Sequence, residues 1–212
     1  MNLPLNTGLN VAILGGTFDP IHNGHLRIVE KLAPRFDLIM IIPSGQPQLK
    51  SGPVTASGGH RLAMCEAALD DLPEEISSKV VVNDLEIERS GATYTYDTLH
   101  QLRGFFPRDK FTLIIGSDAA SHFGQWKRSK DLSKMANILV VRRPGVAKSE
   151  FSEIEIDAIE ISATQIRHAI AIGSQELMEQ YLSPSVIKYM NSHHIYPQAP
   201  TRSSEEKTLR NN

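Results

Sequence analysis

The sequence predicts an α/β protein built on a doubly wound, mostly parallel sheet. Short runs of Val, Ile and Leu recur along the chain, and segments with apolar residues at helical spacing separate these runs. Strands that alternate with helices in this way form parallel sheets that are covered on both faces. No fixed-period repeat is present, which argues against a solenoid or a propeller. Parallel sheets of this kind bind ligands at the carboxyl ends of their strands.

The first strand is expected at 11–16, where VAILGG precedes a turn. A helix follows, because Leu26, Val29 and Leu32 have the spacing of one helix face. Apolar or β-branched runs predict the remaining strands at 37–44, 80–88, 111–118, 137–145 and 154–162. Helical spacing predicts helices at 60–69 and 96–106, a helix after Ser162 that carries Ile166, Ala169 and Ile170, and helices at 177–182 and 186–193.

These elements are expected to form a single domain over residues 1–197, with a leader at 1–10. Residues 45–59 are rich in glycine and contain few large apolar anchors, so they are expected to form a mobile loop. Residues 198–212 are polar and contain Leu209 as their one large apolar side chain. We expect these residues to form a disordered tail, because they cannot offset the entropy of ordering.

Composition excludes several classes of protein. The chain has 22 Lys and Arg against 24 Asp and Glu, for a net charge of −2, and no basic run that would suit a nucleic acid. No apolar run approaches the roughly 20 residues that cross a bilayer, so no membrane association is expected. Cys65 is the only cysteine and cannot form an internal disulfide, which favours the cytoplasm. The sequence leaves the oligomeric state open, a homo-oligomer included.

The segment from Gly15 to His25, GGTFDPIHNGH, carries the strongest chemical signal. Its glycines end a strand and let backbone N–H groups approach a ligand closely. His22 and His25 lie three residues apart at the start of a helix, so their imidazoles share one face of its first turn. This arrangement suits a polyphosphate. A zinc site is the rival use of two histidines, but no third ligand stands at a recognised spacing. A P-loop is excluded because no Gly-Lys-Ser/Thr follows the turn.

The GGTFDPIHNGHL string resembles the signature of the nucleotidyltransferase superfamily in the form carried by bacterial nicotinate-nucleotide adenylyltransferases. The resemblance extends from about residue 11 to 196. It implies a Rossmann-like nucleotidyltransferase fold with C-terminal helices. It also implies that the backbone of Gly15, Gly16, Thr17 and Phe18 binds ATP together with His22 and His25.

A second superfamily element, Ile-Ser-x-Thr-x-x-Arg, is present as Ile161, Ser162, Thr164 and Arg167 with their intervening residues. Ser162 or Thr164 is expected to cap the helix that follows. The guanidinium of Arg167 then lies one turn further on, beside backbone donors. By resemblance these four residues contact ATP, and Arg167 contacts the departing polyphosphate.

A third element is Gly116 followed by Asp118 at a strand end, with Trp126 eight residues later. Gly116 lets the backbone approach an adenosine, and Asp118 offers a carboxylate to the ribose or to a Mg²⁺-bound water network. Trp126 is the only tryptophan and is predicted to stack on an aromatic ring of the ligand. The alternative is that it is a core residue that packs near the surface. By resemblance Trp126 and its neighbour Lys127 bind the pyridine end of nicotinate mononucleotide.

Three further positions follow from the resemblance. Tyr94 and Thr95 match the family's Tyr-Thr element near the nicotinate carboxylate, although Thr93 replaces its leading serine. The family's Pro-Pro-His-Lys is Gln-Pro-Gln-Leu-Lys here, so the histidine is lost. Lys50 is expected to reach ATP phosphates, and a solvated loop lysine is the alternative. After the strand at 137–145, Arg143 is assigned to ATP, and the choice between Arg142 and Arg143 stays open.

The implied reaction transfers the adenylyl group of ATP to nicotinate mononucleotide and releases pyrophosphate. The attacking phosphate is already an anion, so no general base is required, and catalysis reduces to alignment and charge stabilisation. Mg²⁺ is expected to be carried by ATP rather than by protein side chains. Two alternatives stand beside this function. One is an adenylyltransferase for another phosphate acceptor such as phosphopantetheine, and the other is a nucleotide-binding regulator with little turnover.

Overall fold

The computed structural model describes residues 7–47, 54–142, 148–156 and 162–196. Within these residues one six-stranded sheet has the order β4-β2-β1-β6-β7-β8, and every neighbouring pair is parallel. The predicted doubly wound parallel sheet is confirmed. The strands are β1 (Asn10–Gly16), β2 (Leu38–Pro43), β4 (Val80–Val82), β6 (Lys110–Gly116), β7 (Asn137–Arg142) and β8 (Ser152–Glu155).

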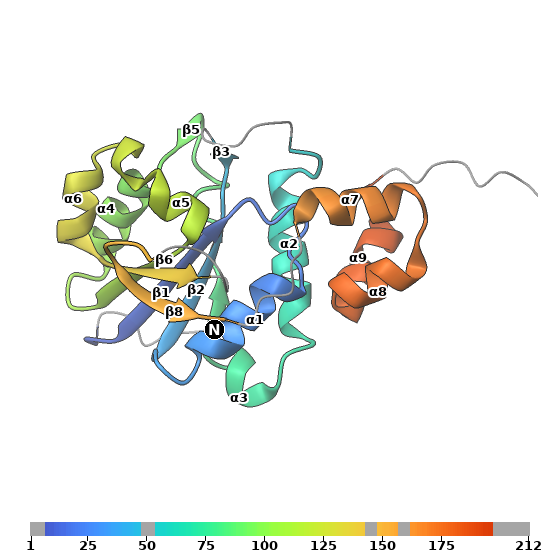
Figure 1. Ribbon diagram of the computed structural model, residues 1–212, viewed down its shortest axis with the longest axis horizontal. Helices are drawn as coiled ribbons and strands as arrows, with labels where there is room; N and C mark the ends of the chain where they lie inside the picture. The colour runs from blue at the N-terminus through green and yellow to red at the C-terminus, as the bar shows by residue number, and fades with distance from the viewer. Residues whose placement is uncertain (1–6, 48–53, 143–147, 157–161, 197–212) are drawn as a thin grey trace, which may run out of the picture.

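Helices cover both faces of this sheet (Figure 1). Side chains of a strand alternate between faces. In β1, Ala12 and Leu14 therefore pack with α1 (Asn23–Leu32) and α2 (Gly58–Leu69), whereas Val11 and Ile13 pack with α4 (Thr95–Phe105) and α6 (Ser129–Met135). The two resulting apolar layers bury strands that the sequence shows as continuous apolar runs.

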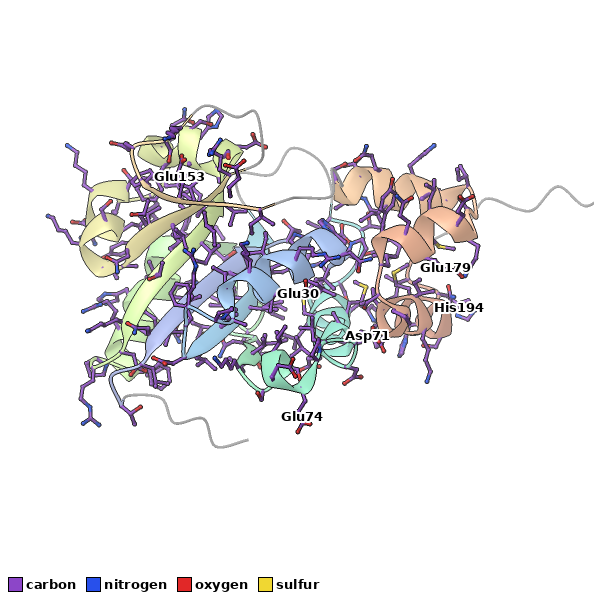
Figure 2. The ribbon with its side chains drawn as sticks, turned by 60° about the horizontal axis from the view of Figure 1, so that its bottom comes forward. Glu30, Asp71, Glu74, Glu153, Glu179 and His194 are labelled. Atoms are coloured by element: carbon purple, nitrogen blue, oxygen red, sulfur yellow. The ribbon has the colours of Figure 1, made fainter. Side chains whose placement is uncertain are left out.

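Three helices, α7 (Ala163–Ala171), α8 (Gln175–Tyr181) and α9 (Pro184–His193), lie beside α2 at one end of the sheet (Figure 1). Asp71, which follows α2, ties this group to the body of the molecule (Figure 2). Its carboxylate accepts hydrogen bonds of 2.9 Å from both the backbone N–H and the hydroxyl of Ser185, in the first turn of α9. An acidic side chain at a helix N-terminus satisfies donors that have no partner within the helix.

Several short elements were not expected from the sequence because they are too short to show a period. They are α3 (Glu74–Ser77), α5 (Ser117–Ser121), the 3-10 turn η1 (Phe123–Gln125), and a two-stranded parallel sheet of β3 (Gln46–Pro47) and β5 (Ala92–Thr93). The α6 helix was also not expected.

The expected strand over 80–88 is wrong beyond Val82. The side chain of Asn83 accepts a hydrogen bond of 3.0 Å from the backbone N–H of Leu85, and such a turn competes with strand pairing. The expected strand over 111–118 ends at Gly116, because Ser117 begins α5.

The other differences concern element ends. The strand expected over 137–145 ends at Arg142, and 143–147 lie outside the described residues. The strand expected over 154–162 is β8, which begins at Ser152 and ends at Glu155, and 157–161 are outside the described residues as well. Helix α2 begins at Gly58, before the expected start at His60, because Ser57 caps it by accepting from the His60 N–H.

The described parts of the expected loop over 45–59 and of the expected leader over 1–10 belong to the fold. Gln46 and Pro47 form β3, and residues 48–53 lie outside the described part of the chain. Asn10 begins β1, and the backbone N–H groups of Gly8 and Leu9 both donate to the carboxylate of Asp109. Among the described residues, no helix is long and apolar enough to cross a membrane.

Deleting residues 198–212 is expected to leave both fold and activity unchanged, because that segment contains too little apolar surface to stabilise the domain. Differential scanning calorimetry should give a melting temperature within a few degrees of the full chain, and kcat should be the same. A larger drop in melting temperature would show that the segment packs on the domain.

Candidate functional site

One cavity of about 920 Å³ opens at the carboxyl ends of the central strands. Gly15 and Gly16 line it from the end of β1, and Gly116 and Ser117 from the end of β6. The strand order reverses direction between these two strands, since β2 lies on one side of β1 and β6 on the other. This switch point is where doubly wound sheets bind ligands.

The turn after β1 has a backbone that the sequence motif explains. Phe18 adopts a φ of 49°, an uncommon left-handed conformation for a bulky residue and one often found at ligand sites. Its ring folds back over Gly16, where a Cβ would lie 2.9 Å from Phe18 Cζ, so glycine is needed at this position. The same ring packs edge-on against His25, with centroids 4.9 Å apart. The turn therefore places its backbone against the cavity and orients one of the predicted imidazoles.

The two predicted histidines lie together at the start of α1. Their ring centroids are 3.7 Å apart, and both rings line the cavity. His25 Nδ1 accepts a hydrogen bond of 3.2 Å from the backbone N–H of His22. A neutral imidazole that accepts at Nδ1 carries its proton on Nε2, so Nε2 is the donor of this ring. This tautomer suits an anionic oxygen.

The second predicted element is the start of α7. Of the two residues expected as its cap, the structure selects Ser162, whose hydroxyl accepts from the Gln165 N–H while the Gln165 side chain accepts from the Ser162 N–H. Thr164 lies within the first turn and accepts from Arg167 Nη2. Arg167 Nη1 donates to the backbone carbonyl of Asp19 at 2.8 Å. The guanidinium therefore lies against the turn after β1.

The opposite end of the cavity is formed by the start of α4. Pairing of β3 with β5 holds the segment before α4 next to the end of β2, and the buried Thr93 hydroxyl contacts the carbonyl of Gln46. Tyr94 is the N-cap residue, and no side chain caps this helix. Tyr94, Thr95 and Tyr96 line the cavity, so the positive end of the α4 dipole faces it.

Trp126 and Lys127 lie beside this helix terminus and line the same cavity. The Trp126 ring is half-buried against Phe123, with centroids 5.4 Å apart, so the core contact that was its alternative is present, and its stacking on a ligand stays a prediction. Lys127 Nζ lies 2.8 Å from a carboxylate oxygen of Asp97 and 4.5 Å from the centroid of the Tyr94 ring. The lysine charge is thus already paired at the surface.

Besides Asp19, two acidic residues line the cavity. Asp118, exposed in the first turn of α5, lies at the end of β6 as predicted. Glu86 was not predicted. It accepts a 2.7 Å hydrogen bond from the buried hydroxyl of Thr98, which also accepts from Arg89. Glu86 therefore places a negative charge at the α4 end of the cavity, where Lys127 and Asp97 balance one another.

Sequence reasoning missed two buried charged residues that support the site. Arg61 is fully buried in α2 and donates to three loop carbonyls, those of Thr17 at 2.7 Å, Gly45 at 3.2 Å and Ala56 at 3.3 Å. Burial lowers the pKa of Arg61, and the charge of Asp19 opposes this effect. Asp19 is part of the motif from Gly15 to His25, but the sequence assigned it no function. The sequence around Arg61 did not indicate this role, because two of its three partners, Thr17 and Gly45, are 44 and 16 residues away.

The predicted site residues fall into three groups. The following line the cavity: Gly15, Gly16, Thr17, Phe18, His22, His25, Tyr94, Thr95, Gly116, Asp118, Trp126, Lys127 and Ser162. Thr164 and Arg167 lie behind the turn and do not line it. Lys50, Arg143 and Ile161 lie outside the described residues. Arg142 forms ion pairs with Glu153 and Glu155 at the end of β7 and β8.

Fold and cavity together define a class of nucleotide-binding α/β protein, and comparison with known families agrees. Residues 13–169 match the cytidylyltransferase-like family, so the chain is a member of that class. A probable nicotinate-nucleotide adenylyltransferase of Frankia alni is 36% identical over 194 residues, which cover 86% of this chain and 98% of that protein. Its counterpart in Oceanobacillus iheyensis is 35% identical over 191 residues, 88% of this chain and 96% of that protein. The chain belongs to the nicotinate-nucleotide adenylyltransferase family.

Solved structures support the same fold. The nicotinic acid mononucleotide adenylyltransferase of Plasmodium falciparum, in complex with NaAD, superposes with a TM-score of 0.76 at 23% identity and covers 88% of this chain and 97% of its own. A nicotinate-nucleotide adenylyltransferase from Vibrio parahaemolyticus superposes with a TM-score of 0.67 at 22% identity, over 88% of this chain and 94% of its own. The predicted fold is confirmed by these neighbours.

Proposed function

We propose that this chain transfers the adenylyl group of ATP to nicotinate mononucleotide, forming nicotinate adenine dinucleotide and pyrophosphate in NAD biosynthesis. The observation that carries the proposal is one cavity with a glycine turn and two adjacent imidazoles at one end and a helix N-terminus beside Trp126 at the other. The first end suits a polyphosphate, and the second suits an aromatic ring that bears a carboxylate. Family membership supports this assignment of substrates.

The phosphate end stabilises charge rather than moving a proton. The mononucleotide phosphate is already ionised, so the reaction needs its approach to the α-phosphorus of ATP to be aligned and the departing charge to be stabilised. His22 and His25 donate to phosphate oxygens, and the backbone of residues 15–18 cradles the triphosphate. Arg167, whose guanidinium lies behind this turn, supplies positive charge to the departing pyrophosphate. Lys50, Arg143, Ile161, Ser162 and Thr164 complete the proposed ATP contacts, and Gly116 and Asp118 face its ribose.

The acceptor end binds the nicotinate moiety. The first backbone N–H groups of α4, at Thr95 and Tyr96, are donors for a carboxylate, and the helix dipole favours an anion there. Trp126 stacks on the pyridine ring, and Tyr94 and Lys127 form the rim.

The reaction uses a divalent cation that we assign as Mg²⁺ carried by ATP. Among the described residues, no group of three or more His, Cys, Asp or Glu side chains could hold a metal ion. Mg²⁺ in nucleotide sites is bound by phosphates and water with one or two carboxylates, and Asp118 supplies one carboxylate at the cavity. The bound cation would neutralise charge on the phosphate oxygens.

Release of pyrophosphate tests the proposal directly. Incubation with ATP, Mg²⁺ and nicotinate mononucleotide is expected to release pyrophosphate and form the dinucleotide in equal amounts, as measured by a coupled phosphate assay and by chromatography. Phosphopantetheine in place of the mononucleotide is the control, and it should give no pyrophosphate. Binding of ATP without turnover would instead favour a nucleotide-binding regulator.

A further inference from the structure

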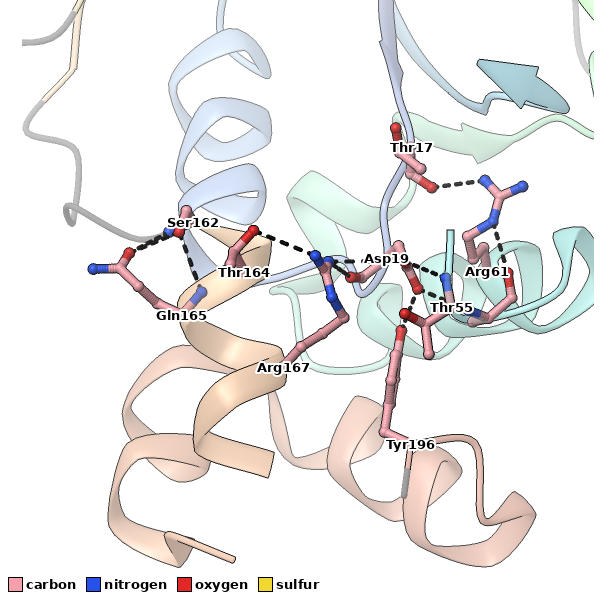
Figure 3. Close-up of polar contacts among 10 residues, drawn as sticks. Thr17, Asp19, Thr55, Arg61, Ser162, Thr164, Gln165, Arg167 and Tyr196 are labelled. Carbon is pink, nitrogen blue, oxygen red and sulfur yellow. Dashed lines mark hydrogen bonds and ion pairs between the residues drawn. The ribbon is translucent and has the colours of Figure 1, made fainter. Parts of the chain in front are cut away.

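A buried carboxylate at the turn after β1 accepts three hydrogen bonds from two segments that are distant in sequence. Asp19 is only 1% exposed. Its side chain accepts hydrogen bonds from the backbone N–H of Thr55 at 2.9 Å, the backbone N–H of Ala56 at 3.0 Å and the hydroxyl of Tyr196 at 2.8 Å (Figure 3). These partners are 36, 37 and 177 residues away. A buried carboxylate with three such donors has one preferred orientation.

Asp19 also positions the arginine of the α7 motif. Its backbone carbonyl accepts from Arg167 Nη1 at 2.8 Å, and the same nitrogen lies 3.7 Å from Asp19 Oδ2. Thr164 holds the other end of the guanidinium through Nη2. Figure 3 shows Arg167 and Tyr196 approaching Asp19 from separate segments of the C-terminal part of the chain. The orientation of Arg167 therefore depends on the position of Asp19.

Tyr196 is suited to act as a permanent donor to this carboxylate. Its side chain is buried, and burial together with the negative charge of Asp19 raises the pKa of the phenol, so the hydroxyl keeps its proton. Asp19 lies between Phe18, with its left-handed backbone, and His22, the N-cap residue of α1. A shift of Asp19 would therefore move residues on both sides of it that line the cavity.

We propose that Tyr196 is a positioning residue of the phosphate site, whose hydroxyl orients Asp19 and through it Arg167 and the turn before His22. The proposal rests on the proposed adenylyl transfer. Tyr196 lies beyond residues 13–169, the part of the chain that matches the family model, so the active-site architecture extends to a segment outside that match. Adenylyl transfer depends on the alignment of the two reacting phosphates. A loss of Arg167 orientation is therefore expected to lower kcat more than it changes KM.

Tyr196→Phe removes the hydroxyl and keeps the packed ring. We expect kcat to fall about tenfold while KM for nicotinate mononucleotide changes less than about twofold. The matched control is Tyr189→Phe in α9, which also removes a hydrogen-bonded tyrosine hydroxyl, 3.1 Å from His60 Nδ1, but one whose partner is not Asp19. Its kcat should equal that of the unmodified chain. Kinetics are taken about 10 °C below the lowest melting temperature, so that every variant is folded.

A double-mutant cycle tests the route of the effect. In an Arg167→Ala background, Tyr196→Phe is expected to lower kcat by less than about twofold further, because the main group that it orients through Asp19 is gone. Chains that end at Pro197 and at Ile195 provide a second comparison, in which only the shorter chain is expected to lose kcat.

Equal kcat for Tyr196→Phe and Tyr189→Phe, or full additivity with Arg167→Ala, would overturn the proposal. Absence of turnover in the unmodified chain would instead overturn the proposed function. In that case, an unchanged position of Asp19 and Arg167 in a crystal structure of Tyr196→Phe would overturn the positioning role too.

Discussion

Replacing His25 with alanine is expected to lower kcat/KM by about 30-fold or more, equivalent to about 2 kcal/mol of transition-state stabilisation. The imidazole lines the cavity beside His22, and its Nδ1 already accepts from the His22 backbone, so Nε2 is its donor. A donor to phosphate oxygens acts most strongly when negative charge moves onto the leaving group. The loss is therefore expected in kcat, with little change in KM for the mononucleotide.

Steady-state kinetics with both substrates varied measure this split. His168→Ala is the matched control, because His168 is exposed on α7 and does not line the cavity. Thermal denaturation of both variants checks that the fold is retained, since His25 also packs on Phe18. An unchanged kcat in folded His25→Ala would show that the imidazole does not stabilise the transition state.

The unmodified chain is expected to prefer nicotinate mononucleotide over nicotinamide mononucleotide by about 100-fold or more in kcat/KM. The two ligands differ by one charge. Backbone donors at the start of α4 form charge-assisted hydrogen bonds with a carboxylate, whereas a carboxamide directs its own N–H₂ at some of the same donors. Comparable kcat/KM values for the two mononucleotides would contradict this account of specificity.

Thr95 allows the backbone donor to be removed by itself. Thr95 is the first residue of α4, where proline is tolerated, and Tyr94 before it has the extended backbone (φ −128°, ψ 140°) that a following proline requires. Thr95→Pro is therefore expected to reduce the acid-to-amide ratio about tenfold or more, because it lacks the N–H. Thr95→Ala keeps the N–H and is the control, with a ratio near that of the unmodified chain.

Two nearby substitutions separate charge and stacking from these backbone donors. Trp126→Ala should weaken both mononucleotides with little change in their ratio, because a ring stacks on acid and amide alike. Lys127→Met should change the ratio only slightly, because the lysine is paired with Asp97 at an exposed position and Glu86 adds a negative charge nearby. A large fall in the ratio for Lys127→Met would show that the lysine charge, rather than the helix terminus, recognises the carboxylate.

The sequence by itself determined the sheet, the order of its major elements and the phosphate turn. Each of these depends on local or periodic signals: apolar runs for strands such as 37–44, helical spacing for Leu26, Val29 and Leu32, and the compact motif from Gly15 to His25. The pairing of His22 with His25 also followed from the sequence, since a spacing of three at a helix start places both rings on one face.

Only the tertiary structure decided which groups support that turn. Asp19 receives hydrogen bonds from residues 36, 37 and 177 positions away, and Arg61 donates to the carbonyls of Thr17, Gly45 and Ala56, which are 44, 16 and 5 positions away. The structure also chose Ser162 over Thr164 as the α7 cap, and it showed that Asn83 ends the strand begun at Val80. The physical reason is shared: local propensity and periodicity depend on near neighbours, whereas a buried polar group is satisfied by whichever distant backbone or hydroxyl the packing of the sheet and helices brings to it.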